Sequence, residues 1–356
     1  MKIFAINPGS TSTKIALYDD ESCLWSDTQR YDADVLGRFK AVTDQEQFRY
    51  DEITKVLEIR GMNPKDFAAV VGRGGLMKPI KGGVYRVNEA MLEDLRYMKY
   101  GAHASNLGAP LADGFAAAAG GQIPAFIVDP VVVDEMADEA RFSGLPEMPR
   151  ISIFHALNQK AVARRAASEL EKNISECNLV VAHMGGGVSV GAHESGRVID
   201  VNNALDGDGP MSPERSGSVP IGGLVTMCFS GKYTMPEIQK KISGAGGLVA
   251  HLGTNDLGEV EKRIANGDAN ASLVFEAMAL QIAKEIGRCA VVLKGNVDAV
   301  VLTGGMARSD KLCGRIVPMV SFIAPVLRYP GEDELEALAH GALRVLRGEE
   351  SPRQYK

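Results

Sequence analysis

Residues 3–19 read IFAINPGSTSTKIALYD, and the fold prediction starts from this segment. Two apolar runs flank a small polar turn, which is the pattern of a β-hairpin. Gly9 lets the backbone approach a ligand closely, the Ser and Thr residues after it offer hydroxyl and amide donors, and Lys14 adds a positive charge. Clustered donors beside a single cation favour a phosphate group over a neutral ligand. The alternative is an ordinary Gly/Ser turn, and the stretch contains no P-loop motif.

A second copy of this unit follows later in the chain. Residues 179–194 read LVVAHMGGGVSVGAHE, again two apolar runs around a glycine-rich turn. Asn7 and His183 hold equivalent positions at the ends of the two first strands. Repetition of a supersecondary unit indicates two related halves. We therefore hypothesise that the two hairpins hold one phosphate chain.

Composition and charge narrow the class of protein. The chain has 356 residues, which is long enough for two domains. Its residues are 45% hydrophobic and 24% charged, as in globular proteins. A net charge of −6 without a basic tail makes nucleic acid and anionic membranes poor partners. The five cysteines are scattered without C-x-x-C spacing, which favours a reducing compartment and no zinc site. No leader and no long apolar run is seen, so we expect a cytoplasmic protein.

The apolar periodicity predicts strands alternating with helices. A Pro-rich stretch around residues 146–149 marks the expected domain boundary, and residues 206–223 form an irregular, Gly-rich loop. Besides the two hairpins, the expected strands are residues 24–31, 67–71, 125–128, 197–201 and 299–303, and the expected helices are residues 45–60, 89–100, 107–119, 158–172, 272–293 and 333–347.

Four polar residues stand just past predicted strands or in the long loop, where ligands of α/β sheets gather. They are Arg73, Asp129, His183 and Arg215. Each has an ordinary alternative: a solvated loop arginine, a turn-starting Asp before Pro, a core histidine, and an arginine paired with Glu214. We interpret the remaining histidines as structural, namely His155, His193, His251 and His340.

Three segments resemble the two phosphate motifs and the adenosine motif of the acetate and butyrate kinase family, within the superfamily that contains sugar kinases and actin. They read INPGSTSTKIALY, VVAHMGGGVSVGAHESGRVIDVNN and VVLTGGMARS, and LDGDGPMSPERSG is similar to the butyrate kinase branch. The resemblance covers essentially the whole chain. It implies an α/β fold of two duplicated actin-like (ribonuclease H-like) domains with mixed sheets and a central nucleotide cleft. The implied domains are residues 1–150 plus 335–356, and residues 151–334, and a homodimer or larger homo-oligomer is expected.

The resemblance also implies roles for individual residues, with ATP and Mg²⁺ as cofactors. Arg73 and Arg215 would hold the substrate carboxylate and the phosphoryl oxygens, and His183 and His103 would donate to the phosphoryl group. Asp129 and Asn7 would hold the metal. The other nucleotide contacts would come from Ser10, Ser12, Lys14, Gly185, Gly186, Gly187, Gly304, Gly305 and Met306. Ala307-Arg308-Ser309 stands where acetate kinases carry Gly-Glu-Asn, so a metal arrangement cannot be copied from them.

The implied reaction is ATP + butanoate ⇌ ADP + butanoyl phosphate by direct in-line transfer. A carboxylate acceptor is already ionised at neutral pH and needs no general base. Small residues beside the candidate groups (Gly74, Gly75, Ala102, Ala182) predict room for an acyl chain longer than acetate. The alternatives are an acetate, propionate or branched-chain carboxylate kinase, a sugar kinase with Asp129 as base, and an actin-like filament or switch protein.

Overall fold

The computed structural model describes residues 1–356, and the chain divides into two compact units. The first contains residues 1–133 and 333–356, and the second contains residues 134–332. The chain passes from one unit to the other after residues 133 and 332, earlier than the expected boundaries at 150 and 334. Side-chain contacts explain the first difference. Glu135 pairs with Lys160 at 2.8 Å and Arg150 pairs with Asp200 at 2.8 Å, so the Pro-rich stretch belongs to the second unit.

The first unit is built on a mixed seven-stranded sheet in the order β12-β5-β6-β4-β1-β2-β3. The strands are β1 (Lys2–Pro8), β2 (Ser12–Asp19), β3 (Ser22–Arg30), β4 (Ala69–Arg73), β5 (Val84–Arg86), β6 (Ala125–Val128) and β12 (Arg353–Gln354). The predicted hairpin is confirmed, because β1 runs antiparallel to β2, and β2 antiparallel to β3. On its other side β1 is parallel to β4, which is parallel to β6.

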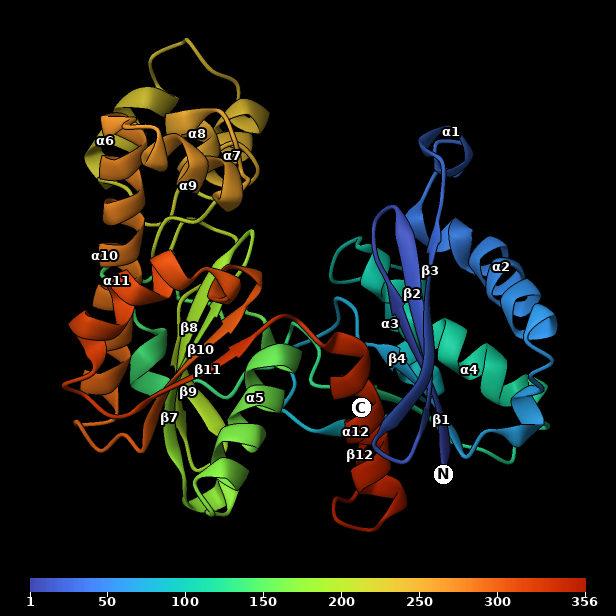
Figure 1. The fold of residues 1–356 in the computed structure, drawn as a ribbon. Helices are drawn as coiled ribbons and strands as arrows, with labels where there is room; N and C mark the ends of the chain where they lie inside the picture. Colours follow the sequence, from blue (N-terminus) through green and yellow to red (C-terminus); the bar gives the residue numbers. More distant parts are fainter. The chain divides into compact units, whose positions relative to one another are not determined.

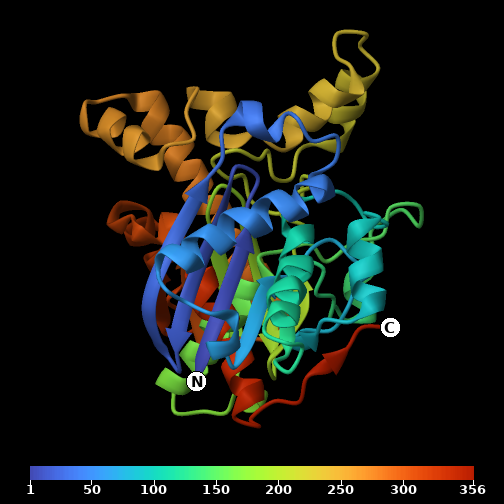
Figure 2. The same ribbon diagram turned by 90° about the vertical axis from the view of Figure 1, so that its right-hand side faces the viewer.

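Helices cover both faces of this sheet. They are α1 (Ala33–Leu36), α2 (Glu46–Ile59), α3 (Glu89–Arg96), α4 (Gly108–Ala118) and α12 (Glu334–Leu346). Phe4 and Ile6 of β1 pack in one apolar core with α2 and α4, which cross the same face in Figure 2. Side chains alternate along a strand. Asn7 therefore points to the opposite face, where Glu334 of α12 meets it.

The second unit repeats the central part of the first. Its sheet has the order β11-β10-β7-β8-β9, with β7 (Asn178–Met184), β8 (Val188–Glu194), β9 (Arg197–Val201), β10 (Ala299–Gly304) and β11 (Val326–Pro330). β7 is antiparallel to β8 and parallel to β10, as β1 is to β2 and β4. Both units also carry a register shift at the equivalent step, between Leu17 and Tyr18 in β2 and between Ala192 and His193 in β8. The predicted duplication is thus visible down to a β-bulge.

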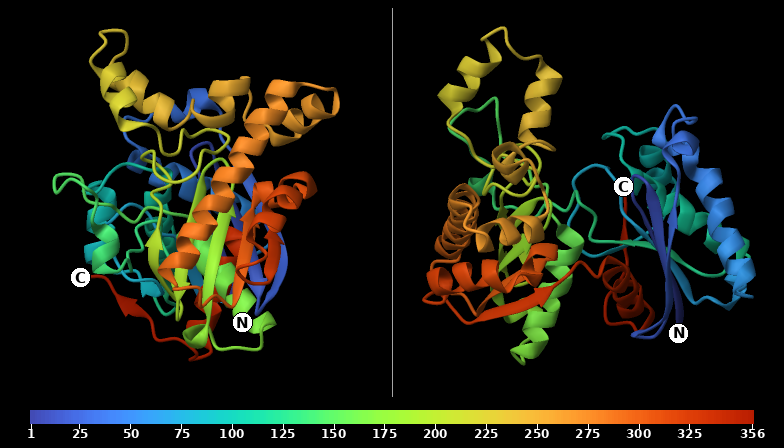
Figure 3. Two further views of the ribbon diagram at one scale, coloured as in Figure 1. Left: turned by 90° about the vertical axis from the view of Figure 1, so that its left-hand side faces the viewer. Right: turned by 45° about the horizontal axis from the view of Figure 1, so that its top comes forward.

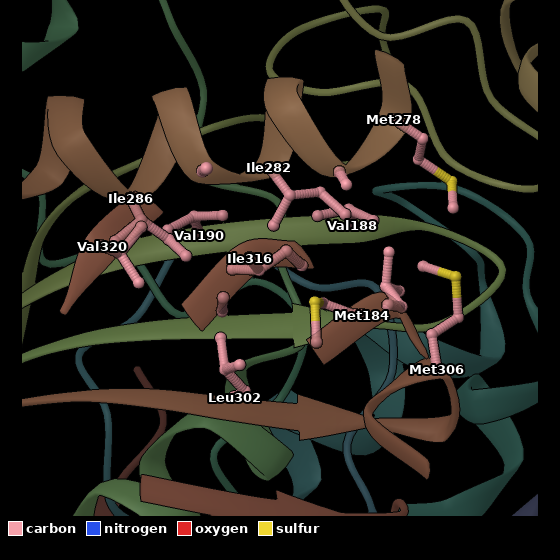
Figure 4. Close-up of a cluster of buried hydrophobic side chains, with 14 of the residues drawn as sticks. Met184, Val188, Val190, Met278, Ile282, Ile286, Leu302, Met306, Ile316 and Val320 are labelled. Atoms are coloured by element: carbon pink, nitrogen blue, oxygen red, sulfur yellow. The ribbon is translucent and has the colours of Figure 1, made fainter. Parts of the chain in front are cut away.

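Helices of the second unit flank its sheet and gather at one end of it (Figure 1). They are α5 (Ala156–Glu169), α6 (Ile221–Cys228), α7 (Met235–Ile242), α8 (Gly247–Leu252), α9 (Leu257–Ala265), α10 (Ala269–Val292) and α11 (Asp310–Val320). The long helix α10 lies across the sheet in the left view of Figure 3. Its Ile282 packs with Val190 of β8 and Leu302 of β10 in a buried cluster that also includes Met306 (Figure 4). None of the helices combines the length and the apolar character needed to cross a bilayer.

Candidate functional site

Three side chains of the first unit meet at the C-terminal end of β1. The Asn7 amide nitrogen donates to Glu334 Oε2 at 2.5 Å, and Arg73 Nη1 donates to Asn7 Oδ1 at 3.3 Å. Arg73 Nη1 also lies 3.0 Å from Glu334 Oε1. Two of these residues were predicted for the site, and the structure brings them together. The third, Glu334, is a carboxylate that the sequence interpretation did not include.

The turn between β1 and β2 lies next to this group. Lys14 is the direct cross-strand partner of Asn7, and opposite residues of a pair share one face of the sheet. Ser12 precedes Lys14 by two positions, so its side chain lies on that face too. Ser10 and Lys14 are exposed, so a ligand can reach their side chains. The hairpin therefore presents Ser12 and Lys14 on the same face as Asn7, with Ser10 in the turn between the strands.

His103 and Asp129 complete the predicted residues of this unit. His103 Nδ1 lies 2.8 Å from the Ser105 hydroxyl, and partial burial together with the charge of Arg73 lowers the pKa of the imidazole. Asp129 follows β6 with a φ of 38°, a left-handed conformation that Asp tolerates better than most residues. Its carboxylate is buried and accepts a hydrogen bond of 2.6 Å from the backbone N–H of Gly83.

His183 is the centre of the second unit's group. Its Nδ1 donates to Asn158 Oδ1 at 2.8 Å, since an amide oxygen can only accept. Its Nε2 lies 3.1 Å from Glu332 Oε1. The ring of His155 stacks on it with centroids 3.8 Å apart and 9° between the planes. His155, which was interpreted from the sequence as structural, thus packs directly against His183.

The glycine turn after β7 is shaped by the groups around it. A Cβ on Gly185 would lie 2.8 Å from Glu332 Oε1, and one on Gly187 would lie 1.9 Å from Arg215 Nη1. The guanidinium of Arg215 thus lies directly against the turn. It donates to the Ala204 carbonyl, and burial lowers the pKa of the guanidinium. Arg215 thus does more than pair with Glu214, because it also donates to the Ala204 carbonyl, and Glu214 itself accepts from Asn255 at 2.5 Å.

A pocket of about 550 Å³ opens within the second unit beside this turn. Its lining includes four residues that were predicted to contact the nucleotide, namely Gly185, Gly186, Gly305 and Met306. The rest of the lining is Pro213, Glu214, Asn255, Asp256, Leu257, Gly258, Glu261, Arg308, Ser309 and Glu332. Backbone from two glycine turns, the start of α9 and several polar side chains therefore surround one space.

Two predicted nucleotide contacts fall outside this lining. Gly187 lies against Arg215, as described above. Gly304 has a φ of 88°, and a Cβ on it would lie 2.3 Å from the backbone oxygen of Met184. Close packing beside the pocket accounts for glycine at these two positions, and their predicted contact with the nucleotide stays a prediction.

The small residues near Arg73 and His183 do not leave empty space for a longer acyl chain. A Cβ on Gly74 would lie 2.5 Å from Pro130 Cβ, and one on Gly75 would lie 2.6 Å from Asn106 Cα. The protein itself fills the space that the small residues were expected to leave. Ala182 is buried in the core of the second unit, on the face opposite His183. The prediction that these three residues make room for a longer acid is wrong.

Several residues of the two groups were missed from the sequence. Glu332 and Glu334 follow β11 in the acidic stretch Gly-Glu-Asp-Glu, and Glu334 is the first residue of the last helix. That stretch was a readable signal, since acidic residues after a strand and at a helix start often lie at an open end of the sheet. Asn158 gave no such signal, because it lies within α5 and reaches His183 only through the tertiary fold.

Comparisons with known proteins agree with this picture. The acetokinase family profile matches residues 149–319. The sequence is 56% identical over 355 residues to butyrate kinase 2 of Clostridium acetobutylicum, and 55% identical to butyrate kinase 1 of the same organism, covering 100% of this chain and 99% of each relative. The crystal structure of Porphyromonas gingivalis acetate kinase superposes with a TM-score of 0.77 at 19% identity, covering 96% of this chain and 98% of that one. The predicted α/β fold with two mixed sheets, of the actin-like class, is confirmed by this similarity.

Proposed function

Because this chain belongs to the acetokinase family, we propose that it transfers the terminal phosphoryl group of ATP to butyrate and forms butanoyl phosphate. The observation that carries the proposal is the identity of 56% over the whole length with a butyrate kinase. The choice of butyrate rests on that similarity, since the glycines after Arg73 leave no additional room.

The pocket of the second unit supports ATP as the phosphoryl donor. The backbone of two glycine turns lines the pocket, and backbone N–H groups suit phosphate oxygens. Met306 offers an apolar surface for a base. We assign the nucleotide to this pocket and the phosphoryl contacts to Ser10, Ser12 and Lys14 of the first unit.

Arg73 and Arg215 are the proposed charged donors. Arg73 already pairs with the carboxylate of Glu334 at 3.0 Å, which supports a role in binding a carboxylate substrate. The substrate carboxylate needs no base, so the barrier lies in bringing two anions together while charge spreads over the phosphoryl oxygens. A preorganised donor aimed at such charge contributes about 3–4 kcal/mol. His183 and His103 are proposed to donate to the same oxygens, and His155 and Asn158 orient His183.

Magnesium fits the oxygen-rich group of the first unit. The chain has no cluster of three or more His, Cys, Asp or Glu side chains placed to hold a metal by themselves. Mg²⁺ with ATP needs only one or two carboxylates, because the phosphates and water supply the other ligands. Asn7 and Asp129 would hold it together with Glu334, which already meets Asn7. The ion would neutralise phosphate charge as the acid approaches.

We also propose a cytoplasmic homodimer or larger homo-oligomer. All five cysteines are free thiols, which suits a reducing compartment. Helix α6 buries none of its residues, and Ile221 and Phe229 at its two ends are 68% and 88% exposed. Apolar surface of this kind is typical of a contact with a second copy.

The decisive experiment is a panel of linear and branched acids of two to six carbons, assayed with ATP and magnesium. Trapping the product with hydroxylamine identifies an acyl phosphate. We expect kcat/KM to be highest for butyrate. A higher value for acetate or propionate would contradict the substrate, and ATP turnover without hydroxamate would contradict the reaction. Light scattering of the purified chain tests the oligomer, and a monomer would contradict it.

A further inference from the structure

Arg49 of α2 is a buried charge that the proposed mechanism does not use. Its side chain is fully buried, and its hydrogen-bond partners include no carboxylate. The guanidinium instead donates twice to the side-chain oxygen of Gln45, at 3.1 and 2.7 Å, and lies 5.0 Å from the centre of the Tyr31 ring. Burying an unneutralised charge is costly, so this arrangement calls for a reason.

The remaining donors of Arg49 all reach the turn between β1 and β2. Nη1 donates to the carbonyl oxygens of Gly9 and Ser12 at 2.8 and 3.1 Å, and to the Thr13 hydroxyl at 3.1 Å. Nη2 donates to the carbonyl oxygen of Ser10 at 3.3 Å. One side chain thus donates to four oxygen atoms of the turn and the start of β2.

This arrangement fixes the direction of the turn's N–H groups. In a trans peptide the C=O of one residue and the N–H of the next point in opposite directions. With the Gly9 and Ser10 carbonyls facing Arg49, the N–H groups of Ser10 and Thr11 face away from it. Neither N–H donates a hydrogen bond within the protein, and both residues are exposed. Adjacent unsatisfied N–H groups form an anion-binding concavity.

We propose that Arg49 is a positioning residue that orients the Ser10 and Thr11 N–H groups toward the terminal phosphoryl group of ATP and places a positive charge behind them. The inference rests on the proposed function, because it assumes that this turn binds that group. A purely structural role would have Arg49 satisfy carbonyl oxygens and stabilise the hairpin. The two roles differ in what they predict for ATP compared with ADP, since only ATP carries the third phosphate.

The test measures the affinities of MgATP and MgADP by calorimetry in the absence of an acid, so that no transfer takes place. Arg49→Lys keeps the charge but loses the planar fork that reaches several carbonyls. We expect the preference for ATP over ADP to fall by about 10-fold or more, with ADP affinity within about twofold of wild type, as for the loss of a charged contact. Circular dichroism and Tm establish that the variant is folded.

The matched control is Arg60→Lys, at the end of the same helix. Arg60 also lies over an aromatic ring, 4.3 Å from the centre of Trp25, and pairs with Asp27 at 3.1 Å, but it does not contact the turn. We expect it to keep the wild-type ratio of affinities. If Arg49→Lys does not fold, Gln45→Glu replaces it, because this isosteric change neutralises the charge and keeps the acceptor. It should lower the ATP preference while the Tm is held or raised.

A folded variant with the wild-type ratio, or with equal losses for ATP and ADP, would overturn the inference. In that case a wild-type chain that still forms butanoyl phosphate leaves the proposed function intact. A wild-type chain that binds neither nucleotide would instead contradict the proposed function, and this inference with it.

Discussion

The contact between Gly187 and Arg215 provides a sharp test of the second unit's role. Gly187→Ala would place a Cβ 1.9 Å from Arg215 Nη1, 2.4 Å from Cζ and 3.0 Å from Nε. Ordinary Cβ contacts begin near 3.4 Å, so the guanidinium must retreat by about 1.5 Å. The backbone of Gly187 does not have a positive φ, so alanine causes no conformational strain there. The substitution therefore moves a charged donor without removing it.

A misplacement of about 1 Å can lower turnover about 100-fold, which corresponds to about 2.7 kcal/mol of barrier. We expect a fall of this size in kcat for butyrate, measured by hydroxamate trapping, with Tm within a few degrees of wild type because the displaced group is the end of a flexible side chain. Gly314→Ala is the control, since a Cβ on this exposed residue of α11 meets nothing within 4 Å.

Coupling to Arg215 distinguishes this explanation from a general defect. If the alanine acts through the guanidinium, Gly187→Ala combined with Arg215→Ala should be no worse than Arg215→Ala alone, because the second change has nothing left to displace. Near-normal kcat in Gly187→Ala, or additive losses in the double variant, would show that displacement of Arg215 is not the cause.

Three further predictions use other parts of the chain. Arg73→Ala and Arg215→Ala should each lower kcat by about 100-fold or more without unfolding the protein, since each removes a charged donor, and near-normal turnover in both would exclude them from the mechanism. Burial, with the charges of Lys160 and Arg164, lowers the pKa of His193 to about 3. Between about pH 3 and the unfolded pKa near 6.5, the unfolded state binds a proton at His193 that the folded state does not bind. The free energy of unfolding is therefore unaffected above about pH 6.5 and decreases as the pH falls, by about 2 kcal/mol at pH 5. Urea unfolding from pH 7 to 5 should show this slope, and a slope in His193→Gln equal to that of wild type would contradict it. In the native protein a thiol reagent should modify the exposed Cys23 and Cys228 quickly and the three buried cysteines only on unfolding, whereas five fast thiols would contradict the burial.

The hairpins were predictable from the sequence because their information is local. Apolar alternation around a glycine turn determines both strand pairing and which side chains share a face, so Asn7 and His183 fell into equivalent positions. The long, strongly periodic helix α10 was predicted to within three residues at its start. Helices α6 to α9 were not predicted, because α6 is apolar on all sides and the others are short.

The missing parts of the site depend on contacts between distant residues. Asn7 and Glu334 are separated by 327 positions, and no spacing rule connects them. The glycines after Arg73 show the opposite error, in which a local interpretation was possible but wrong. Their small size allows close approach of Pro130 and Asn106, which only the packing reveals. A glycine in the sequence therefore does not by itself indicate an empty space in the fold.

The equivalent bulges in β2 and β8 fix which side chains of each hairpin face inward and which face outward. Each lies the same number of residues beyond its turn, after Leu17 in one unit and after Ala192 in the other. Inserting one residue between the turn and the bulge would reverse this order, so that Lys14 points inward and Thr13 points outward. A loop taken from another protein should therefore be joined to the strand at a position after the bulge. An exchange that carries turn and bulge together preserves the inward and outward alternation of the recipient sheet.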